Sequence, residues 1–395
     1  MPPVSNRMCQ GKRRRSTPQP SASSVHLGNR RGTAPASQDL RRRPPTAPIG
    51  RPADDDRRDR PDFAALAGRP PVENRVGPTL FTESEMETRR FGKTGLDASV
   101  LGFGAAPIGV LDAPQSEIEA VLNLLLDEGV NLIDTAANYA SSEEAIGKAV
   151  AARRDEYILV SKCGQAFPDL KGSAWSAEII HNTIERSLNR LQTEYLDVML
   201  LHSCDLETLQ QGDVIAALVA ARDAGKIRHA GYSGDNQAAA FAAGIKELAV
   251  IETSINICDQ INIDLTLPKT SAADLGVLAK RPIANAAWKP LTDQPGFYTQ
   301  YARDYTQRWS AMGLTLADLE FEGVPDTTWP EIALRFTLGQ PGVHTAIIGT
   351  TNTAHAAANV AAARQGALSA PAIETIRTAF ANTAAKSPDV WRGLT

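Results

Sequence analysis

The sequence has few cysteines and no long apolar run, and both absences narrow the classes of protein open to it. Its four cysteines, Cys9, Cys163, Cys204 and Cys258, show no paired spacing, so neither a disulfide framework nor a metal knuckle is indicated. No apolar run is long enough to span a membrane, and no apolar core follows the first basic run, so a secretory signal is not expected. We therefore expect a reducing, cytoplasmic location.

Residues 1–85 contain few large apolar side chains and differ in composition from the rest of the 395-residue chain. They hold 13 of the 25 prolines, and their 15 Arg and 1 Lys against 9 acidic residues give a net charge of +7. Because the whole chain carries −4, residues 86–395 carry −11. Such a segment buries too little apolar surface to offset its ordering entropy, so we expect residues 1–85 to be disordered.

Three interpretations of this segment stay open. The arginine runs 13–15 and 41–43 suit nucleic acid or an anionic surface. The Arg- and Ser-rich first 50 residues also resemble an organelle transit peptide, although their prolines would break an amphipathic helix. The third interpretation, which we favour, is that the start of the protein is assigned too far upstream, because ordered sequence begins at Met86. Under this interpretation we do not expect nucleic acid to be a partner.

From residue 88 onward, short apolar runs alternate with helical patterns. Residues 89–95 predict a small hairpin. We expect eight strands, at 100–104, 130–133, 157–162, 196–202, 227–233, 249–253, 275–280 and 345–348. Helices are expected at 116–127 and 176–191, with Ser116 and Ser176 as N-caps, and also after 141–144, through Arg222, from Thr353 and near 372–382. This alternation suits an α/β fold, a closed (β/α)8 barrel over residues 86–395.

Three successive strands end in polar residues that can carry chemistry. The second strand runs into Asp134, with Tyr139 five positions beyond, while the third ends in Lys162 and the fourth in His202. Each has an ordinary explanation alone: a capping acid, a lysine reaching water, a hydrogen-bonded core histidine or a packing tyrosine. Because neighbouring strand ends surround one mouth of a barrel, we expect these four groups to converge there, which the separate explanations account for poorly.

Several motifs together resemble the aldo-keto reductases, over about three quarters of the chain. They are Leu101–Gly104, Asp134–Tyr139, Ser142–Glu143, Val160–Lys162, Ser187–Leu191 leading into Leu196–Asp197, Leu200–His202 and Ile348–Thr350. The resemblance implies a (β/α)8 barrel and nicotinamide-dependent reduction of a small aldehyde or ketone, without a metal. Tyr139 would then give a proton to the carbonyl oxygen. We expect Lys162, held by Asp134, to lower the pKa of Tyr139, and His202 to orient the carbonyl.

The residues expected to bind the cofactor depart from the family pattern. Ser233 is present, but the asparagine that usually follows it is replaced by Gly234. Glu252 stands where a glutamine is usual, and Lys280 where an aromatic residue usually stacks on the nicotinamide. Arg281 either reaches the pyrophosphate or is a solvated charge at a strand end. The resemblance also assigns cofactor contacts to a further set of residues, namely Gly104, Gly349, Thr350 and Asn359.

The resemblance favours NADP, although NAD stays possible because the cation that often binds the 2′-phosphate is missing and His355 is the nearest alternative. The segment 284–330 is expected to be a long loop over the substrate pocket, and Trp288, Phe297, Tyr298, Tyr301 and Trp309 either line that pocket or form the loop's own core. Trp175 is a further candidate pocket wall. We expect a monomer or small homo-oligomer without a membrane partner. The alternative function is a cofactor-binding sensor or regulatory subunit on the same barrel.

Overall fold

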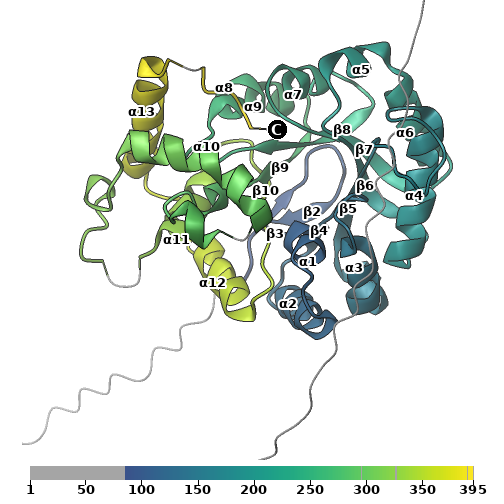
Figure 1. The fold of residues 1–395 in the computed structure, drawn as a ribbon, viewed down its shortest axis with the longest axis horizontal. Coiled ribbons are helices and arrows are strands. Elements are labelled where there is room, and N and C mark those ends of the chain that lie inside the picture. Colours follow the sequence, from purple (N-terminus) through teal and green to yellow (C-terminus); the bar gives the residue numbers. More distant parts are fainter. Residues whose placement is uncertain (1–84, 295, 325–326, 389, 395) are drawn as a thin grey trace, which may run out of the picture. The chain divides into compact units, whose positions relative to one another are not determined.

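A computed structural model describes residues 85–294, 296–324, 327–388 and 390–394 of the chain (Figure 1). The disorder expected for residues 1–85 concerns residues outside these ranges, apart from Glu85. Eight parallel strands form a closed barrel in the order β10-β3-β4-β5-β6-β7-β8-β9, with helices around it (Figure 1). The strands are β3 (Leu101–Gly104), β4 (Leu132–Asp134), β5 (Ile158–Cys163), β6 (Leu196–His202), β7 (Ile227–Ser233), β8 (Leu248–Ser254), β9 (Gly276–Lys280) and β10 (Thr345–Ile348). The predicted (β/α)8 barrel is confirmed.

A short antiparallel hairpin precedes the barrel, as the sequence predicts. It pairs β1 (Thr88–Arg90) with β2 (Asp97–Ser99). Phe91, in its turn, is completely buried and belongs to the cluster of side chains that fills the barrel interior. At Gly92 the φ angle is +54° and an added Cβ would collide with the backbone of residues 274–276, so the hairpin approaches the barrel too closely for any other residue.

The helices connect the strands and cover the outside of the barrel. They are α1 (Ala106–Val110), α2 (Gln115–Asp127), α3 (Ser142–Val150), α4 (Ala177–Leu191), α5 (Leu206–Gln211), α6 (Asp213–Asp223), α7 (Asn236–Ala242), α8 (Ile261–Leu265), α9 (Leu267–Ala272), α10 (Gly296–Met312), α11 (Trp329–Leu338), α12 (Thr353–Arg364) and α13 (Ala370–Lys386). Ser176 caps α4 by accepting a hydrogen bond from the Ile179 amide, as predicted. Ser116 does not cap α2; that prediction is wrong, because the helix begins one residue earlier, after Pro114.

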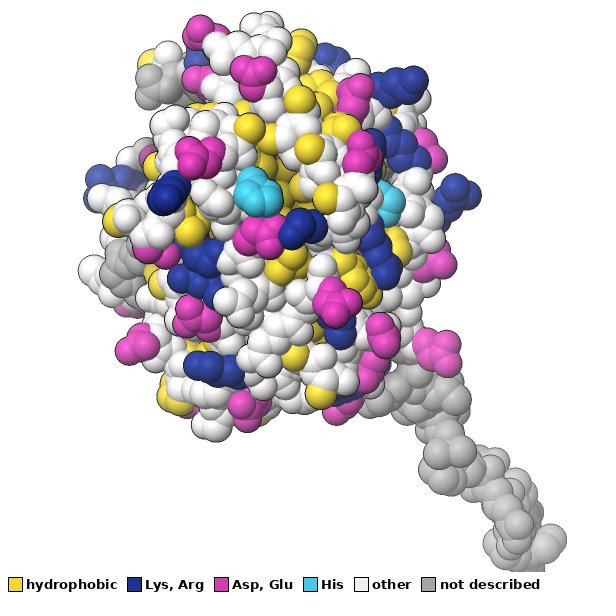
Figure 2. Space-filling view, turned by 90° about the vertical axis from the view of Figure 1, so that its right-hand side faces the viewer, with side chains coloured by type: hydrophobic (Ala, Val, Ile, Leu, Met, Phe, Trp, Pro, Cys, Tyr) yellow, Lys and Arg dark blue, Asp and Glu magenta, His cyan; other side chains and the backbone are white. Residues whose placement is uncertain are grey.

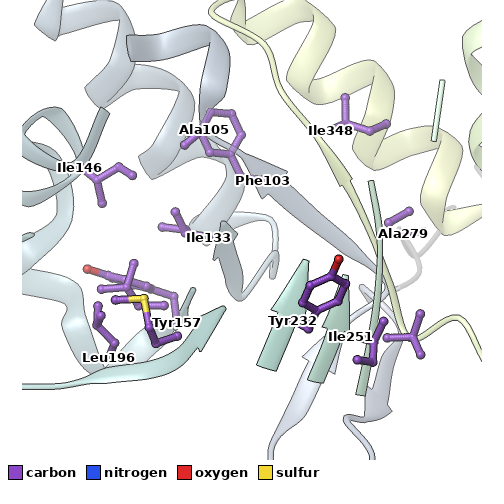
Figure 3. Close-up of a cluster of buried hydrophobic side chains, with 14 of the residues drawn as sticks. Phe103, Ala105, Ile133, Ile146, Tyr157, Leu196, Tyr232, Ile251, Ala279 and Ile348 are labelled. Atoms are coloured by element: carbon purple, nitrogen blue, oxygen red, sulfur yellow. The ribbon is translucent and has the colours of Figure 1, made fainter. Parts of the chain in front are cut away.

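The strands present alternate side chains to two apolar clusters. Outward-facing residues pack against the helices, and part of this cluster is drawn in Figure 3, where Ile133 of β4 and Ile146 of α3 belong to it. A separate cluster, here named the apolar interior, fills the barrel with residues of its strands and of the hairpin: Phe91, Ala98, Leu132, Ile158, Val160, Val198, Leu200, Ala249, Val250, Leu278 and Ile347. The barrel is therefore a packed core rather than a pore, and only its two ends can hold a site.

The segment 284–330 is not the extended loop that the sequence suggested, because most of it folds into the long helix α10 and short 3-10 turns. Trp288 and Trp309 pack with Trp329, their ring centroids 4.4 to 6.4 Å apart, so these aromatics form a core of their own. The side chains of Phe297, Tyr298 and Tyr301 lie outside those described. The apolar residues of this segment thus stabilise a local layer beside α11 and α13.

On the face drawn in Figure 2, acidic and basic side chains are interspersed, with hydrophobic ones scattered between them. Such a mixed surface gives nucleic acid no continuous basic stripe to follow on the described residues of that face. Among the described residues, no helix has the length and apolarity needed to cross a membrane.

Candidate functional site

The inward-facing side chains change character two residues beyond the apolar interior. On five strands an apolar residue of that cluster is followed, at the next inward position, by a residue that can carry charge or a proton. The pairs are Leu132 and Asp134, Val160 and Lys162, Leu200 and His202, Val250 and Glu252, and Leu278 and Lys280. Because side chains alternate along a strand, these five residues form a ring at the carboxyl ends of the strands, here named the charged rim.

Lys162 is the centre of the charged rim. Its side chain is completely buried, and its Nζ lies 2.6 Å from both carboxylate oxygens of Asp134. It also donates to the carbonyl oxygen of Thr135 at 3.0 Å and lies 3.2 Å from Oε2 of Glu252. One buried ammonium therefore lies against two buried carboxylates, and its orientation is fixed by the acceptors of Asp134 and Thr135 at the end of β4.

Tyr139 and His202 lie beside this centre. Lys162 Nζ is 5.3 Å from the centroid of the Tyr139 ring, and the rings of Tyr139 and His202 meet edge to face with centroids 5.7 Å apart. Tyr139, His202 and Asp134 all line one cavity of about 880 Å³. The four residues singled out from the strand ends are therefore brought together, as the sequence predicts.

The direction of the pKa shift at Tyr139 is opposite to the expected one. Burial raises the pKa of Tyr139 above its ordinary value; Lys162 opposes this, while the carboxylates of Asp134 and Glu252 add to it. Burial also lowers the pKa of Lys162, but Asp134 and Glu252 overcome that effect and leave it above its ordinary value. The ammonium thus acts on Tyr139 as predicted, but desolvation and two nearby carboxylates outweigh it.

His202 is neutral at physiological pH. Burial lowers its pKa well below the ordinary value, and the positive charges of Lys162, Lys280 and Arg281 lower it further. A neutral imidazole has one N–H donor and one acceptor nitrogen. His202 can therefore donate one hydrogen bond to an oxygen in the cavity without bringing a second charge beside Lys162.

The residues predicted to hold a cofactor continue around the cavity. Gly104, Ser233, Glu252, Lys280, Arg281 and Gly349 all line it. The Ser233 hydroxyl donates to Oε1 of Glu252 at 3.1 Å, and an added Cβ at Gly349 would collide with the carbonyl oxygen of Gly104. Thr350 and Asn359 are outside the cavity lining; Thr350 Oγ1 accepts from the Asn352 amide at 3.1 Å, and Asn359 lies half-buried on α12. Their contacts with a cofactor stay a prediction.

Lys280 and Arg281 are each tied to partners that the sequence analysis did not single out. Lys280 Nζ lies 3.1 Å from Oδ2 of the buried Asp235, which follows β7. Arg281 donates to the carbonyl oxygen of Leu394 and, at 3.3 Å, to Ser254 Oγ. A carboxylate two positions after Ser233 was a visible sign of the first partner, whereas nothing near Arg281 in the sequence pointed to the second.

Residues 390–394, here named the strap, are held against this side of the barrel. Asn236 Nδ2 donates to the Gly393 carbonyl at 2.9 Å, and the Gly393 amide donates to Asn236 Oδ1 at 2.7 Å. The Leu394 amide donates to Asp259 Oδ2 at 3.0 Å, and Arg308 donates to the Arg392 carbonyl at 2.7 Å. The strap therefore fixes Arg281 from behind the cavity wall.

Among the described residues, amide side chains line the outer part of the cavity. Asn138 Nδ2 donates to Gln165 Oε1 at 2.8 Å, and Gln294 Nε2 donates to the Asn285 carbonyl at 3.0 Å. Trp175 is not part of the lining; it packs on Gly164, where an added Cβ would collide with its ring. The outer cavity is thus rich in hydrogen-bonding groups.

Known proteins are similar to this chain over most of its length. The profile of the aldo/keto reductase family matches residues 100–380. The chain is 28% identical to L-galactose dehydrogenase of Arabidopsis thaliana over 294 residues, covering 71% of this chain and 88% of that protein. It is 28% identical to an uncharacterised oxidoreductase of Bacillus subtilis over 308 residues, or 74% and 96% of the two chains.

Among solved structures, an aldo/keto reductase from Klebsiella pneumoniae in complex with NADP and acetate shares the fold, with a TM-score of 0.61 at 24% identity. The match covers 78% of this chain and all of that one. At this identity the likeness supports the barrel alone.

Proposed function

This chain belongs to the aldo/keto reductase family and is an NAD(P)-dependent oxidoreductase, and from that premise we propose that it converts a small aldehyde or ketone to the alcohol at the charged rim. The observation that carries the proposal is that Asp134, Tyr139 and His202 line one cavity, with the buried Lys162 Nζ 2.6 Å from Asp134 and 5.3 Å from the Tyr139 ring centroid. Four such groups at three successive strand ends have no common structural purpose.

Each of the four residues has a distinct part in the proposed reaction. Tyr139 gives its phenolic proton to the substrate oxygen as negative charge develops there. Lys162, fixed by Asp134, stabilises the phenolate that remains. The neutral His202 donates a hydrogen bond to the same substrate oxygen and so orients the carbonyl carbon. A nicotinamide cofactor, when bound, supplies the hydride.

The cavity wall fits a nicotinamide dinucleotide. Ser233 and Glu252 offer a buried hydroxyl and carboxylate for an amide group, and the glycines Gly104 and Gly349 leave backbone exposed to a flat ring. Lys280 and Arg281 bring positive charge to the same wall, which suits a phosphate. We propose NADP, in keeping with the Klebsiella structure that contains it. Titrating the protein with NADPH and NADH separately would test this choice, since tighter binding of NADH contradicts it.

The substrate that suits the outer cavity is a polyhydroxylated aldehyde or alcohol of sugar size. The side chains of Asn138, Gln165 and Gln294 have further donors and acceptors beyond the bonds they make within the protein, which several hydroxyl groups can use and an unsubstituted aliphatic aldehyde cannot. Similarity to a dehydrogenase of L-galactose is consistent with this class. A screen of aldoses against straight-chain aldehydes of equal length would test it, and a preference for the aliphatic series would contradict it.

The central test is Tyr139→Phe, compared with Tyr157→Phe as a matched control. Tyr157 is a buried tyrosine outside the cavity lining, whose hydroxyl donates to the Val150 carbonyl at 3.4 Å. We expect Tyr139→Phe to lower turnover by roughly 10²- to 10⁴-fold with NADPH binding intact, and the control to retain turnover. Unchanged turnover in Tyr139→Phe would refute the assignment. NADPH binding without turnover in the unmodified protein, over the whole substrate panel, would favour the sensor function instead.

A further inference from the structure

Glu252 is a second carboxylate beside Lys162, whose three N–H groups already have other acceptors. Asp134 offers two oxygens at 2.6 Å and Thr135 one at 3.0 Å, which is enough for the three N–H groups of Lys162. Glu252 Oε2 lies 3.2 Å from the same nitrogen but receives no hydrogen bond. Glu252 is only 2% exposed and lines the cavity, so its second oxygen is a buried acceptor without a donor.

The other charges described at the cavity have partners close by. Asp134 and Lys162 form a bidentate pair, and Lys280 lies 3.1 Å from Asp235. Arg281 is bound to the strap and attracted by Asp235. Among the described carboxylates that line the cavity, Glu252 is the one with an oxygen that receives no hydrogen bond. Its other oxygen accepts from Ser233, so this carboxylate lies at the part of the wall where the proposed function puts the nicotinamide.

We propose that Glu252 makes the site prefer the oxidised, positively charged nicotinamide to the neutral reduced form, more than an enzyme with glutamine at this position would. The inference rests on the proposed function. An oxidised nicotinamide ring carries one positive charge that is lost when it accepts hydride. A carboxylate beside it in a poorly solvated cavity therefore stabilises the oxidised form selectively. The glutamine usual at this position has no such charge.

The same carboxylate affects the proton transfer. Negative charge on Glu252 disfavours the Tyr139 phenolate, as does Asp134, while Lys162 and Arg281 favour it and His202 is neutral. Alcohol oxidation sends the hydride to the nicotinamide and the hydroxyl proton to Tyr139, so Tyr139 must be ionised at the start. Removing the charge of Glu252 should lower the pKa of Tyr139 and let oxidation begin at lower pH.

The test measures dissociation constants of the full chain for NADP⁺ and NADPH, and for NAD⁺ and NADH, by calorimetry. We expect Glu252→Gln to shift the ratio of oxidised to reduced affinity by at least about fivefold toward the reduced form. Glu252→Asp, which keeps the charge, should stay near the unmodified ratio. Glu143→Gln is the matched control, because Glu143 is also a buried glutamate with one oxygen held by a serine at 2.8 Å and the other without a donor, and it is outside the cavity lining.

A ratio in Glu252→Gln within twofold of the unmodified protein, with both forms still bound, would overturn the inference and leave the proposed function standing. Failure of the unmodified protein to bind any nicotinamide would overturn both. A second measurement follows the pH dependence of alcohol oxidation. Its rise should move to lower pH in Glu252→Gln and stay in place in Glu143→Gln, and an unmoved profile in Glu252→Gln contradicts the inference.

Discussion

The apolar interior and the charged rim are lined by the same strands, two residues apart, but they differ in what they contribute. In the interior, Val160 and Leu200 belong to one apolar cluster, and burial stabilises the fold. At the rim, Lys162 and Asp134 are equally buried, and burial there acts on their pKa values instead. The difference teaches that position along an inward-facing series, rather than depth of burial, separates residues that stabilise this barrel from those that can do chemistry.

Lys162→Met should give the largest effect and would test whether the rim also stabilises the fold. Losing the ammonium leaves Asp134 and Glu252 buried without their shared cation. We expect the free energy of unfolding to fall by about 3–5 kcal/mol and turnover to fall by roughly 10²-fold or more. Chemical denaturation and steady-state kinetics provide the two measurements. Normal turnover in the folded variant would remove Lys162 from the proposed mechanism.

Leu200→Ala tests the apolar interior, on the strand next to the one that carries Lys162. Leu200 is completely buried in the interior, one inward position before His202. We expect a loss of about 2–5 kcal/mol in the free energy of unfolding, from lost burial and the cavity left behind. Turnover by the folded fraction should stay near that of the unmodified protein. If turnover fell as far as in Lys162→Met, the separation between interior and rim would be wrong.

Asp259 extends the comparison to the polar groups under the strap. Burial raises the pKa of this carboxyl from 3.8 to about 7, and the negative charge of Asp235 adds to the shift. Between about pH 4 and 7 the unfolded chain is ionised at this position while the folded chain holds its proton, so this group makes stability fall as pH rises. The cost is complete above about pH 7 and amounts to as much as about 4 kcal/mol.

Asp259→Asn should remove that dependence. An asparagine keeps an oxygen to accept from the Leu394 amide and from the Tyr305 hydroxyl, which now bind Oδ2 at 3.0 Å. The variant should therefore gain stability relative to the unmodified protein as pH rises from 4 to 7, as followed by thermal melting. Parallel stability curves for the two proteins would contradict the raised pKa.

Ser176 lies outside both the apolar interior and the charged rim, and Ser176→Ala should give the smallest effect. Its hydroxyl accepts from the Ile179 amide at 3.2 Å at the start of α4, and loss of such a cap costs about 1 kcal/mol. Ser116→Ala is the matched control, because α2 has no side-chain cap, and its stability should be unchanged. Neither change should alter turnover. Equal losses from the two variants would show that something other than capping is being measured.

Much of the barrel could be predicted from the sequence because its strands are short apolar runs with clear ends. β6, β7 and β10 begin and end at the predicted residues. Three of the four groups that converge were found by asking which apolar runs close with a polar residue, and Tyr139 was found on the loop after the first of them. α10 was missed because its segment contributes to a local aromatic layer, so its pattern does not reflect the barrel. Ser116 was misassigned because Pro114, which cannot donate a backbone hydrogen bond, precedes α2.

Other features of the site depend on distances that no local pattern encodes. The contact between Arg281 and Leu394 joins residues 113 positions apart. The pKa of Tyr139 is raised because its own burial and the carboxylates of Asp134 and Glu252 outweigh the ammonium of Lys162. The sequence suggested the ammonium, but the balance between one cation and two anions required their positions in space.

The strap has a consequence for the order in which the chain is synthesised. All eight strands leave the ribosome before residues 390–394 do, since β10 ends at Ile348. Asp134 and Lys162 are synthesised well before Leu394, whose backbone carbonyl binds Arg281. The residues of the proton-transferring side of the cavity are therefore made first, and the group that holds the wall proposed to face the phosphates is made after them.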